Sequence, residues 1–309
     1  MGDRPSGGAG GTAGVGGAAR AADADRAPRV SVLMTCHDAA ATIEESVRSV
    51  IAQSFTDWEL VLVDNGSTDY SVEIVERLGE ARIRIDRLGR DIGRTAALNH
   101  GLTRCRGEYV AVLDADDVAD PSRLARQVAV LDERPEVAAV GSGYRDIDAL
   151  GRAIGTTYLP ADAASMRHRM AHNEPLVHSS VTMRATIVRE IGGYPTKYRY
   201  AQDFALWLAL LATHHIIAIP EPLVSIRRSS GTLSRSPRGA WNVAWDGVRL
   251  YARAQRLPGL RVVDRMRGVR TIAWFAALLA WRTLERAVRR RSGRGVRRES
   301  GRGTGSGAD

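Results

Sequence analysis

Short apolar runs alternate with helical patterns over the first half of the chain. Runs typical of strands lie at residues 30–34, 59–63, 82–86 and 109–113, and apolar residues at helical spacing predict helices over 43–51, through 74–78, over 94–104 and from residue 120. Thr42-Ile43-Glu44-Glu45 has the pattern of a capping box, and Asp120-Pro121 that of a cap with a first-turn proline. This alternation predicts an α/β fold, in which a mostly parallel sheet has helices on both faces.

The pattern is less regular beyond Val140. A short strand is predicted at 181–183, and helices are predicted at 202–212, 241–256 and 262–291. The last of these begins amphipathic and ends in Arg289-Arg290-Arg291. The Gly/Ala-rich residues 1–28 and the Gly-, Arg- and Ser-rich residues 292–309 are expected to be a disordered leader and a disordered basic tail. A folded domain over 29–232 and a helical extension over 233–291 remain between them.

Composition excludes several classes of protein. A hydrophobic content of 44% in 309 residues is enough for a substantial core, and no run reaches the ~18–20 apolar residues of a membrane-spanning helix. The two cysteines, Cys36 and Cys105, make a disulfide framework implausible and favour buried thiols and a cytoplasmic location. The net charge of +9 is concentrated at the end, where nine Arg face three acidic residues from Arg282 onward, so the body is nearly balanced.

Acidic residues follow the predicted strands. Asp114-Ala115-Asp116 ends a central strand, and two carboxylates with this spacing can reach one hard divalent cation, Mn²⁺ or Mg²⁺. The alternative is a helix-capping turn built on Asp117 or Asp120. Further carboxylates end neighbouring strands, at Asp38, Asp64 and Asp69. Because parallel strands end at one edge of a sheet, these side chains are expected to share a ligand.

The order and spacing of several motifs resemble the family 2 glycosyltransferases, which have the Rossmann-like GT-A fold. The motifs are Thr35-Cys36-His37-Asp38, Gln53-Ser54-Phe55, Val63-Asp64-Asn65-Gly66-Ser67-Thr68-Asp69, Leu113-Asp114-Ala115-Asp116-Asp117, His178-Ser179-Ser180, Gly192-Gly193-Tyr194 and Gln202-Asp203. Together they cover residues 30–232, which makes a chance match improbable.

The resemblance implies roles for individual residues. Thr35, Asp38, Asp64 and Asn65 would contact the nucleoside of a sugar nucleotide, Asp116 would bind the metal directly, and Asp114 would contact both ribose and metal. Asp203 would be the general base that accepts the proton of the acceptor hydroxyl. The chain is therefore expected to be a metal-dependent inverting glycosyltransferase.

Two positions depart from the family pattern. Asn65 stands where many members have a second Asp, and its amide offers both a donor and an acceptor to a base edge, so the donor base stays open. Gln202 stands where many members have Glu, which removes one influence that would raise the pKa of Asp203. UDP-sugars are the commonest donors that the resemblance implies, with GDP- and dTDP-sugars as alternatives.

Other residues have two interpretations each. Arg94 would cross the nucleotide site or be solvated, and His178 would approach the diphosphate or acceptor or serve a structural role. Trp207 and Gln202 would lie on the acceptor side, although an aromatic residue on this apolar helix is typical of a core. Arg227-Arg228 would reach phosphate or form a solvated pair.

The basic C-terminal helix suggests peripheral contact with an anionic membrane at the inner face of the plasma membrane, against the plainer alternative that it packs on the catalytic domain. The expected acceptor is a sugar or a lipid-linked glycan in envelope polysaccharide or glycoconjugate synthesis. Two rival functions are an inactive nucleotide-sugar fold with a nucleic-acid-binding tail, and a nucleotidyltransferase. The tail arginines lack interleaved aromatics, so no nucleic acid is expected, and residues 33–42 lack the glycine-rich basic loop of nucleotidyl transfer.

Overall fold

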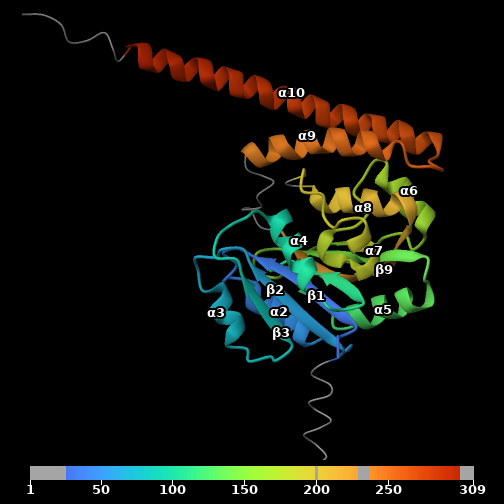
Figure 1. Cartoon of the computed structure of the whole chain (residues 1–309). Coiled ribbons are helices and arrows are strands. Elements are labelled where there is room, and N and C mark those ends of the chain that lie inside the picture. Colours follow the sequence, from blue (N-terminus) through green and yellow to red (C-terminus); the bar gives the residue numbers. More distant parts are fainter. Residues whose placement is uncertain (1–25, 199–200, 229–236, 300–309) are drawn as a thin grey trace, which may run out of the picture.

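The computed structural model describes residues 26–198, 201–228 and 237–299, with the backbone alone at 237–240 and 284–299. One mixed sheet carries helices on both faces, and two long C-terminal helices form a further layer on one side (Figure 1). Residues 1–25 of the predicted leader over 1–28, the boundary at residue 232 and the end of the tail over 300–309 lie outside the described residues.

The first half of the chain follows the predicted alternation. Its elements are β1 (Val30–Cys36), α2 (Ile43–Ile51), β2 (Trp58–Asp64), α3 (Ser71–Glu76), β3 (Ile83–Arg87), α4 (Arg94–Arg104) and β4 (Tyr109–Val112). The strands β3, β2, β1 and β4 are neighbours in this order and pair in parallel. Their carboxyl ends therefore meet at one edge, where Cys36 pairs with Asp64 in the register of β1 and β2.

The second half of the sheet contains both parallel and antiparallel pairs. Its elements are β5 (Val118–Ala119), α5 (Arg123–Glu133), β6 (Val137–Ile147), β7 (Ala153–Thr157), α6 (Ala163–Met170), the 3₁₀ turn η1 (His178–Ser180), β8 (Thr182–Arg184), α7 (Ala185–Glu190), α8 (Gln202–Thr213) and β9 (His215–Arg227). The strand β8 is antiparallel to β4 and β6, β9 is parallel to β6, and β5 and β7 pair antiparallel at the margins.

The strand β6 was not predicted from the apolar pattern, because its second half contains glycines and polar residues. A Cβ at Gly143 would lie 2.4 Å from the carbonyl oxygen of Pro220, so the close approach of β6 and β9 requires glycine there. The pairing of β6 with β9 also shifts register near this residue. Close backbone contact and irregular register therefore replace the alternation that identifies strands in the first half.

Alternate residues of the parallel strands enter two different cores. Val32 and Met34 of β1 pack on the side of α2 and α5, whereas Leu33 of β1 and Val61 of β2 pack on the side of α4 and α8. Successive side chains of a strand point to opposite faces, so a run of consecutive apolar residues indicates a sheet buried on both sides. The predicted placement of helices on both faces is confirmed.

The two predicted caps differ from the observed ones. Thr42 precedes α2, but its hydroxyl makes no cap hydrogen bond and instead donates to the carbonyl oxygen of Ala115 at 2.9 Å. The helix α5 begins at Arg123, and Asp120 accepts hydrogen bonds from both the backbone and the hydroxyl of Ser122. The Thr42 contact attaches the start of α2 to the loop that carries Asp114 and Asp116.

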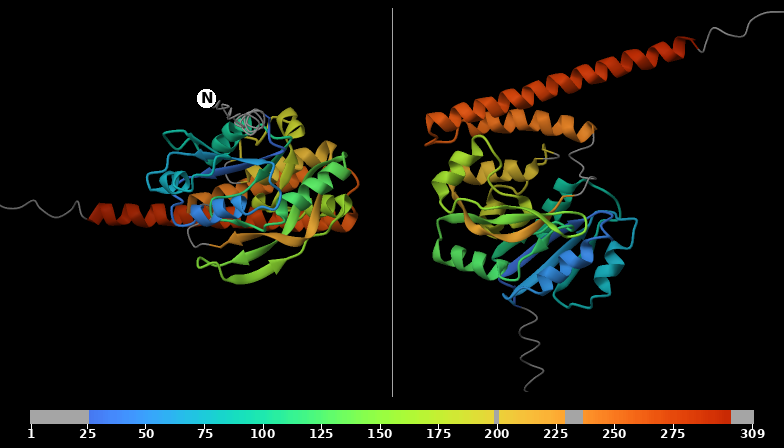
Figure 2. Two further views of the ribbon diagram at one scale, coloured as in Figure 1. Left: turned by 90° about the horizontal axis from the view of Figure 1, so that it is seen from below. Right: turned by 180° about the vertical axis from the view of Figure 1, so that it is seen from behind.

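The C-terminal helices α9 (Pro237–Ala254) and α10 (Val262–Glu299) pack against each other. Leu250, Tyr251 and Ala254 of α9 belong to the same core as α8, so this extension is attached to the domain that contains the sheet. The helix α10 is the outermost layer and runs beyond the body (Figures 1 and 2). It continues to Glu299 rather than ending at residue 291. The arginines between residues 292 and 299 have a high helix propensity, and extending an existing helix costs less free energy than starting a new one. None of the helices in the described ranges is long and apolar enough to span a membrane.

Candidate active site

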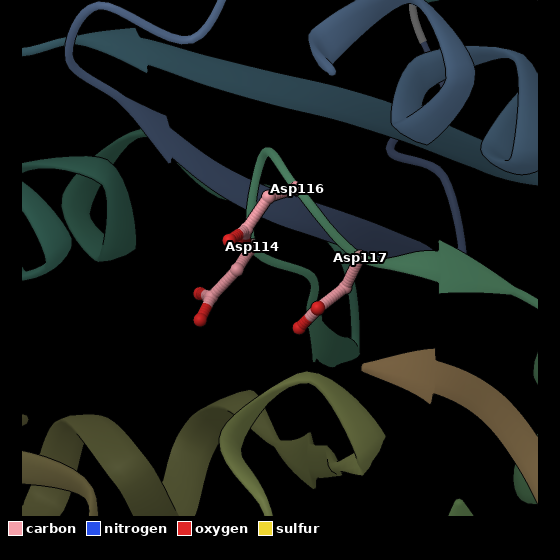
Figure 3. Close-up of side chains that lie close together, drawn as sticks. All are labelled: Asp114, Asp116 and Asp117. Atoms are coloured by element: carbon pink, nitrogen blue, oxygen red, sulfur yellow. The ribbon is translucent and has the colours of Figure 1, made fainter. Parts of the chain in front are cut away.

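Three carboxylates lie side by side on the loop between β4 and β5 (Figure 3). One oxygen from each of Asp114, Asp116 and Asp117 lies within 4.8 Å of the others. The loop is held by Ser179 of η1, which accepts a hydrogen bond from the Asp114 backbone N–H at 3.1 Å and donates to Asp117 Oδ2 at 2.5 Å. The strand end and the His178-Ser179-Ser180 turn therefore fix this cluster together.

Asp114 is neutralised by two partners. Nη2 of Arg94 lies 2.6 Å from each of its carboxylate oxygens, and Nδ1 of His178 lies 3.0 Å from Oδ1. Burial acts to raise the pKa of Asp114, but Arg94 and then His178 outweigh it and hold the pKa well below its usual range. Arg94 and His178, both candidates from the sequence, therefore lie at the Asp114 carboxylate.

Asp116 and Asp117 have raised pKa values. Burial, followed by the charges of Asp114 and Asp116, raises the pKa of Asp117 to about 8, and burial and Asp114 raise the pKa of Asp116. Both oxygens of Asp117 are occupied, by Ser179 and by the backbone N–H of Arg227 at 2.9 Å. Within the described part of the chain, no other residue donates a hydrogen bond to the Asp116 carboxylate, so this group can serve as a ligand.

This donor set fits a hard divalent cation. Crowded carboxylates that raise one another's pKa values are stabilised by a positive ion, and oxygen ligands are those that Mg²⁺ and Mn²⁺ prefer. Asp116 and Asp114 would hold the ion, and Asp117, already bonded within the protein, would set the shape of the loop.

The two loops after β1 and β2 hold each other. Asp38 has a φ of 51°, and its Oδ1 accepts from the Thr68 backbone N–H at 2.7 Å, while Asp64 Oδ1 accepts from the Ser67 backbone N–H at 2.9 Å. Thr35 lies half-buried near the end of β1, beside these loops. The sequence-predicted nucleoside residues are therefore gathered at the carboxyl edge of β1 and β2.

The side-chain amide of Asn65 is hydrogen-bonded within the protein. Its Nδ2 donates to Asp91 Oδ1 at 2.7 Å, and its Oδ1 accepts from the Ile92 backbone N–H at 3.0 Å. Both groups that sequence reasoning assigned to a base edge thus position the loop before α4 in this structure.

Asp203 lies in the first turn of α8 and has a partner that sequence reasoning missed. The side chain of Glu174 hydrogen-bonds to Asp203. The Glu174 side chain is exposed at one side. The protein packed around its carboxyl group disfavours the charged form, and the negative charge of Asp203 adds to this effect, so the pKa of Glu174 is raised well above its ordinary value. Glu174 is therefore placed to donate a hydrogen bond to Asp203. It lies in an irregular loop, where no spacing relates it to Asp203.

Arg94 and Tyr194 connect the two acidic groups. The pKa of Arg94 is raised chiefly by Asp114 and, after the opposing effect of burial, also by Asp203 and Asp116. The hydroxyl of Tyr194 lies 2.9 Å from Nε2 of His178, and burial, then Asp203 and Asp114, raise the pKa of Tyr194 well above its ordinary value. Asp203 and the Asp114–Asp116 loop are therefore within electrostatic reach of the same residues.

The remaining candidates lie in the interior. Trp207 is fully buried in the core, which favours the structural interpretation that its apolar helix allowed. Gln202 is buried, and its Oε1 has no hydrogen-bond partner among the residues that the structure describes. Cys36 and Cys105 are buried as expected, and burial raises the pKa of both thiols to about 12.

Arg227 is not part of a solvated pair. It is buried, and its guanidinium donates to the Asp116 carbonyl oxygen at 3.0 Å and to Glu45 Oε2 at 2.5 Å. Arg228 instead pairs with Asp146 at 2.6 Å. Arg227 is the last residue of β9, and its hydrogen bond to the Asp116 carbonyl oxygen helps to hold the Asp116 loop in place.

Solved structures share this fold. TarS residues 1–349 from S. aureus, in complex with UDP-GlcNAc, superpose with a TM-score of 0.62 at 20% identity, covering 81% of this chain and 72% of TarS. The mannosyltransferase PcManGT from Pyrobaculum calidifontis, in complex with GDP-Man and Mn²⁺, gives 0.59 at 22% identity, covering 88% and 81%. The predicted GT-A fold is confirmed.

Sequence comparison identifies the family. Residues 31–192 match the model of "Glycosyl transferase family 2". The putative glycosyltransferase EpsE of Bacillus subtilis is 32% identical over 214 residues, which cover 67% of this chain and 76% of EpsE. The amylovoran biosynthesis glycosyltransferase AmsE of Erwinia amylovora is 28% identical over 226 residues, covering 72% and 84%. This chain therefore belongs to glycosyltransferase family 2, whose polysaccharide-synthesising members are among its relatives.

Proposed function

We propose that this glycosyltransferase moves a sugar from a nucleotide-diphosphate donor to an acceptor hydroxyl, with inversion at the anomeric carbon and with a divalent cation at Asp116 and Asp114. The observation that carries the proposal is the pair of acidic groups around Arg94 and Tyr194: one suited to a cation, the other centred on Asp203. A donor diphosphate and an acceptor hydroxyl need these two kinds of group on opposite sides of the transferred sugar.

In the proposed reaction, Asp203 accepts the proton of the acceptor hydroxyl while that oxygen forms a bond to the anomeric carbon. The bond from the anomeric carbon to the diphosphate oxygen breaks on the opposite face, and the nucleoside diphosphate leaves with the bonding electrons. One in-line displacement inverts the anomeric centre without a covalent intermediate. When bound, the divalent cation supplies positive charge to the leaving diphosphate.

Asp203 is suited to the base role because a neighbouring carboxyl group can donate a hydrogen bond to it. Glu174 has a raised pKa and hydrogen-bonds to Asp203. The phenol of Tyr194 and the guanidinium of Arg94 are close enough to sense that charge. We assign Gln202 to the acceptor side, since its buried Oε1 lacks a hydrogen-bond partner in the described ranges.

The donor nucleoside is proposed to bind over Thr35, Asp38 and Asp64 at the carboxyl edge of β1 and β2. TarS is described in complex with UDP-GlcNAc and PcManGT with GDP-Man and Mn²⁺, which supports a sugar nucleotide and a divalent cation. We retain a UDP-sugar as the first candidate. Since the Asn65 amide is engaged by Asp91 and Ile92, we expect backbone groups of these loops to read the base.

The acceptor is proposed to be a sugar or a lipid-linked glycan in envelope polysaccharide synthesis, as the name of AmsE suggests for that relative. Such an acceptor would place the enzyme at the cytoplasmic face of a membrane, attached peripherally through its C-terminal helices. This location agrees with the long outer helix α10.

The experiment is an assay of a panel of sugar nucleotides with and without Mn²⁺, using permeabilised-cell glycan extracts as acceptors. Metal-dependent release of a nucleoside diphosphate, and a product whose anomeric configuration by ¹H NMR is opposite to that of the donor, are expected. Release of pyrophosphate would support nucleotidyl transfer instead. Donor binding without turnover for any donor and acceptor would support the inactive binding fold.

A further inference from the structure

The outward face of α10 is apolar between Val262 and Ala280. Fully described side chains that face away from the body recur every three or four residues, at Val262, Met266, Val269, Ala273, Ala276, Ala277 and Ala280. Val262 is 74% exposed, Met266 64% and Val269 59%. The opposite stripe, which includes Asp264, Gly268 and Phe275, packs on the protein. The helix therefore has apolar residues on its solvent side as well as on its packed side, where Ile272 and Phe275 contact the core.

Arginine and tryptophan border this apolar stripe along one edge. Arg267, Arg270, Trp274 and Trp281 follow one another there, and Trp274 and Trp281 are 60% and 66% exposed. Aromatic rings beside arginines, next to an apolar stripe, are the composition of a helix that lies in the headgroup region of a bilayer. In Figures 1 and 2, α10 is the outermost element, with the body on one side of it only.

An open pocket of about 370 Å³ lies at the same edge, between the end of α6 and α10. It is lined by His172, Arg267, Arg270, Thr271 and Trp274, without any carboxylate. Arg270 makes no ion pair with any described residue, and the nearest acidic partner of Arg267 is Asp264 at 3.8 Å. Asp264 is already bound more closely by Arg261 at 2.7 Å. The pocket thus keeps uncompensated positive charge.

His172 connects the turn after α6 to α10. Its Nδ1 is buried and so does not reach the open volume. The hydroxyl of Thr271 donates to the His172 carbonyl oxygen at 3.1 Å, which fixes this turn against α10. Two guanidinium groups and an indole around a small open volume match a phosphate group attached to an apolar body.

We propose that this pocket binds the phosphate of an anionic phospholipid headgroup, while the apolar stripe of α10 enters the acyl boundary of the same bilayer. The pocket and the stripe share Arg267, Arg270 and Trp274 as their common edge, so one flat surface can engage both. This site is separate from the Asp114–Asp203 site, and the proposal does not depend on the proposed reaction.

A second copy of the chain fits the stripe less well. Four of its seven members are alanines, which would bury little area in a helix–helix contact, and the arginines along its edge would repel those of another copy. A free phosphate ion would account for the pocket but not for the adjoining exposed Met266, Val269 and Trp281. A lipid headgroup accounts for both.

The test is sedimentation of the full chain with vesicles of phosphatidylcholine alone and of phosphatidylcholine mixed with phosphatidylglycerol. We expect binding to the anionic vesicles only, weakened by salt and accompanied by a blue shift of tryptophan fluorescence. The double variant Arg267→Gln/Arg270→Gln should lose at least about tenfold in vesicle affinity. The control Arg77→Gln/Arg134→Gln removes the same charge from exposed positions elsewhere and should bind as the parent does.

Further arms separate the alternatives. Val269→Glu should also abolish vesicle binding, and circular dichroism should show that each variant remains folded. Equal binding of the pocket variant and its control, or no preference for anionic vesicles, would overturn the proposal. Thermal stabilisation by inorganic phosphate without vesicle binding would assign the pocket to free phosphate, and a concentration-dependent dimer that Val269→Glu dissociates, without vesicle binding, would assign the stripe to a second copy.

Discussion

The carboxyl group of Glu174 hydrogen-bonds to the carboxylate of Asp203, although the two residues belong to different segments of the second half of the chain. The position directly before Asp203 holds the neutral Gln202, whose side chain is buried. The carboxyl group next to Asp203 therefore comes from a residue that is distant in the sequence, and not from the position directly before it. Arg169 and Arg228 also act electrostatically on Glu174.

Glu174 is predicted to position Asp203 by donating a hydrogen bond. Glu174→Gln keeps a donor and should retain kcat within about threefold, whereas Glu174→Leu removes the donor and should lower kcat about tenfold or more at unchanged donor KM. Steady-state kinetics check this split. Glu190→Gln, which changes an exposed glutamate on α7, is the matched control. Equal activity of the Leu and Gln variants would show that the hydrogen bond has no functional effect.

The same pair predicts a difference in pH dependence. Because the pKa of Glu174 is raised, its proton is retained in the folded protein at pH values where an ordinary glutamate is ionised. As pH rises through the raised value, a second negative charge appears beside Asp203 and the hydrogen bond is lost. The parent should therefore lose kcat more steeply than Glu174→Gln as pH rises through that pKa. Superimposable profiles of the two proteins would contradict this assignment.

Metal binding should stabilise the fold in a pH-dependent way. Burial and neighbouring carboxylates raise the pKa of Asp117 to about 8, so the metal-free protein loses the stability contributed by that proton as pH rises toward 8. Mn²⁺ competes with protons for the cluster, and its effect on Tm should grow from pH 6 to pH 8. Thermal melts with and without MnCl₂ measure it. Asp116→Asn should abolish the shift and Asp57→Asn should not; a shift independent of Asp116 would place the metal elsewhere.

Arg94 is predicted to hold Asp114 for the donor. Arg94→Ala leaves the Asp114 carboxylate with His178 as its remaining side-chain partner, which should weaken binding of the donor nucleotide with Mn²⁺ by about 10- to 100-fold. Arg94→Lys restores one cationic donor and should recover part of the loss. Isothermal titration calorimetry compares the three proteins. Unchanged affinity in Arg94→Ala would show that Arg94 has no part in donor binding.

Gly66 is predicted to be essential to the turn after β2. Its φ is +78°, and a Cβ there would lie 2.4 Å from the Arg90 carbonyl carbon. Gly66→Ala should therefore lower the free energy of unfolding by about 2 kcal/mol or more. Gly79→Ala has a similar φ of +64° but open space around the new Cβ, so it should cost only about 1 kcal/mol. Urea unfolding compares them; equal losses would mean that contact with Arg90 is unimportant.

Sequence predicted the first half of the fold well because its strands are buried on both faces. Uninterrupted apolar runs mark β1, β2 and β4, and the predicted helix over 94–104 coincides with α4. The edge to which Asp38, Asp64 and Asp114 belong follows from parallel pairing alone. The roles of these residues were indicated by the family motifs, because hydrophobic periodicity predicts secondary structure and not function.

The rest of the site depends on contacts between irregular segments. Glu174 reaches Asp203 from a loop, Asn65 is engaged by Asp91, and Arg227 turns inward to Glu45, and none of these pairs has a characteristic spacing. The register shifts of β6 on β9 likewise follow from glycines that allow close approach. Such long-range pairings are fixed by tertiary packing, which local patterns do not encode.

The most direct test of the central claim measures donor binding and turnover in Asp203→Asn and Asp116→Asn side by side. Asp203→Asn should bind the donor nucleotide with Mn²⁺ as tightly as the parent and lose at least about 100-fold in kcat, because only the proton acceptor is removed. Asp116→Asn should lose metal-dependent nucleotide binding itself. Full turnover by Asp203→Asn would contradict the account.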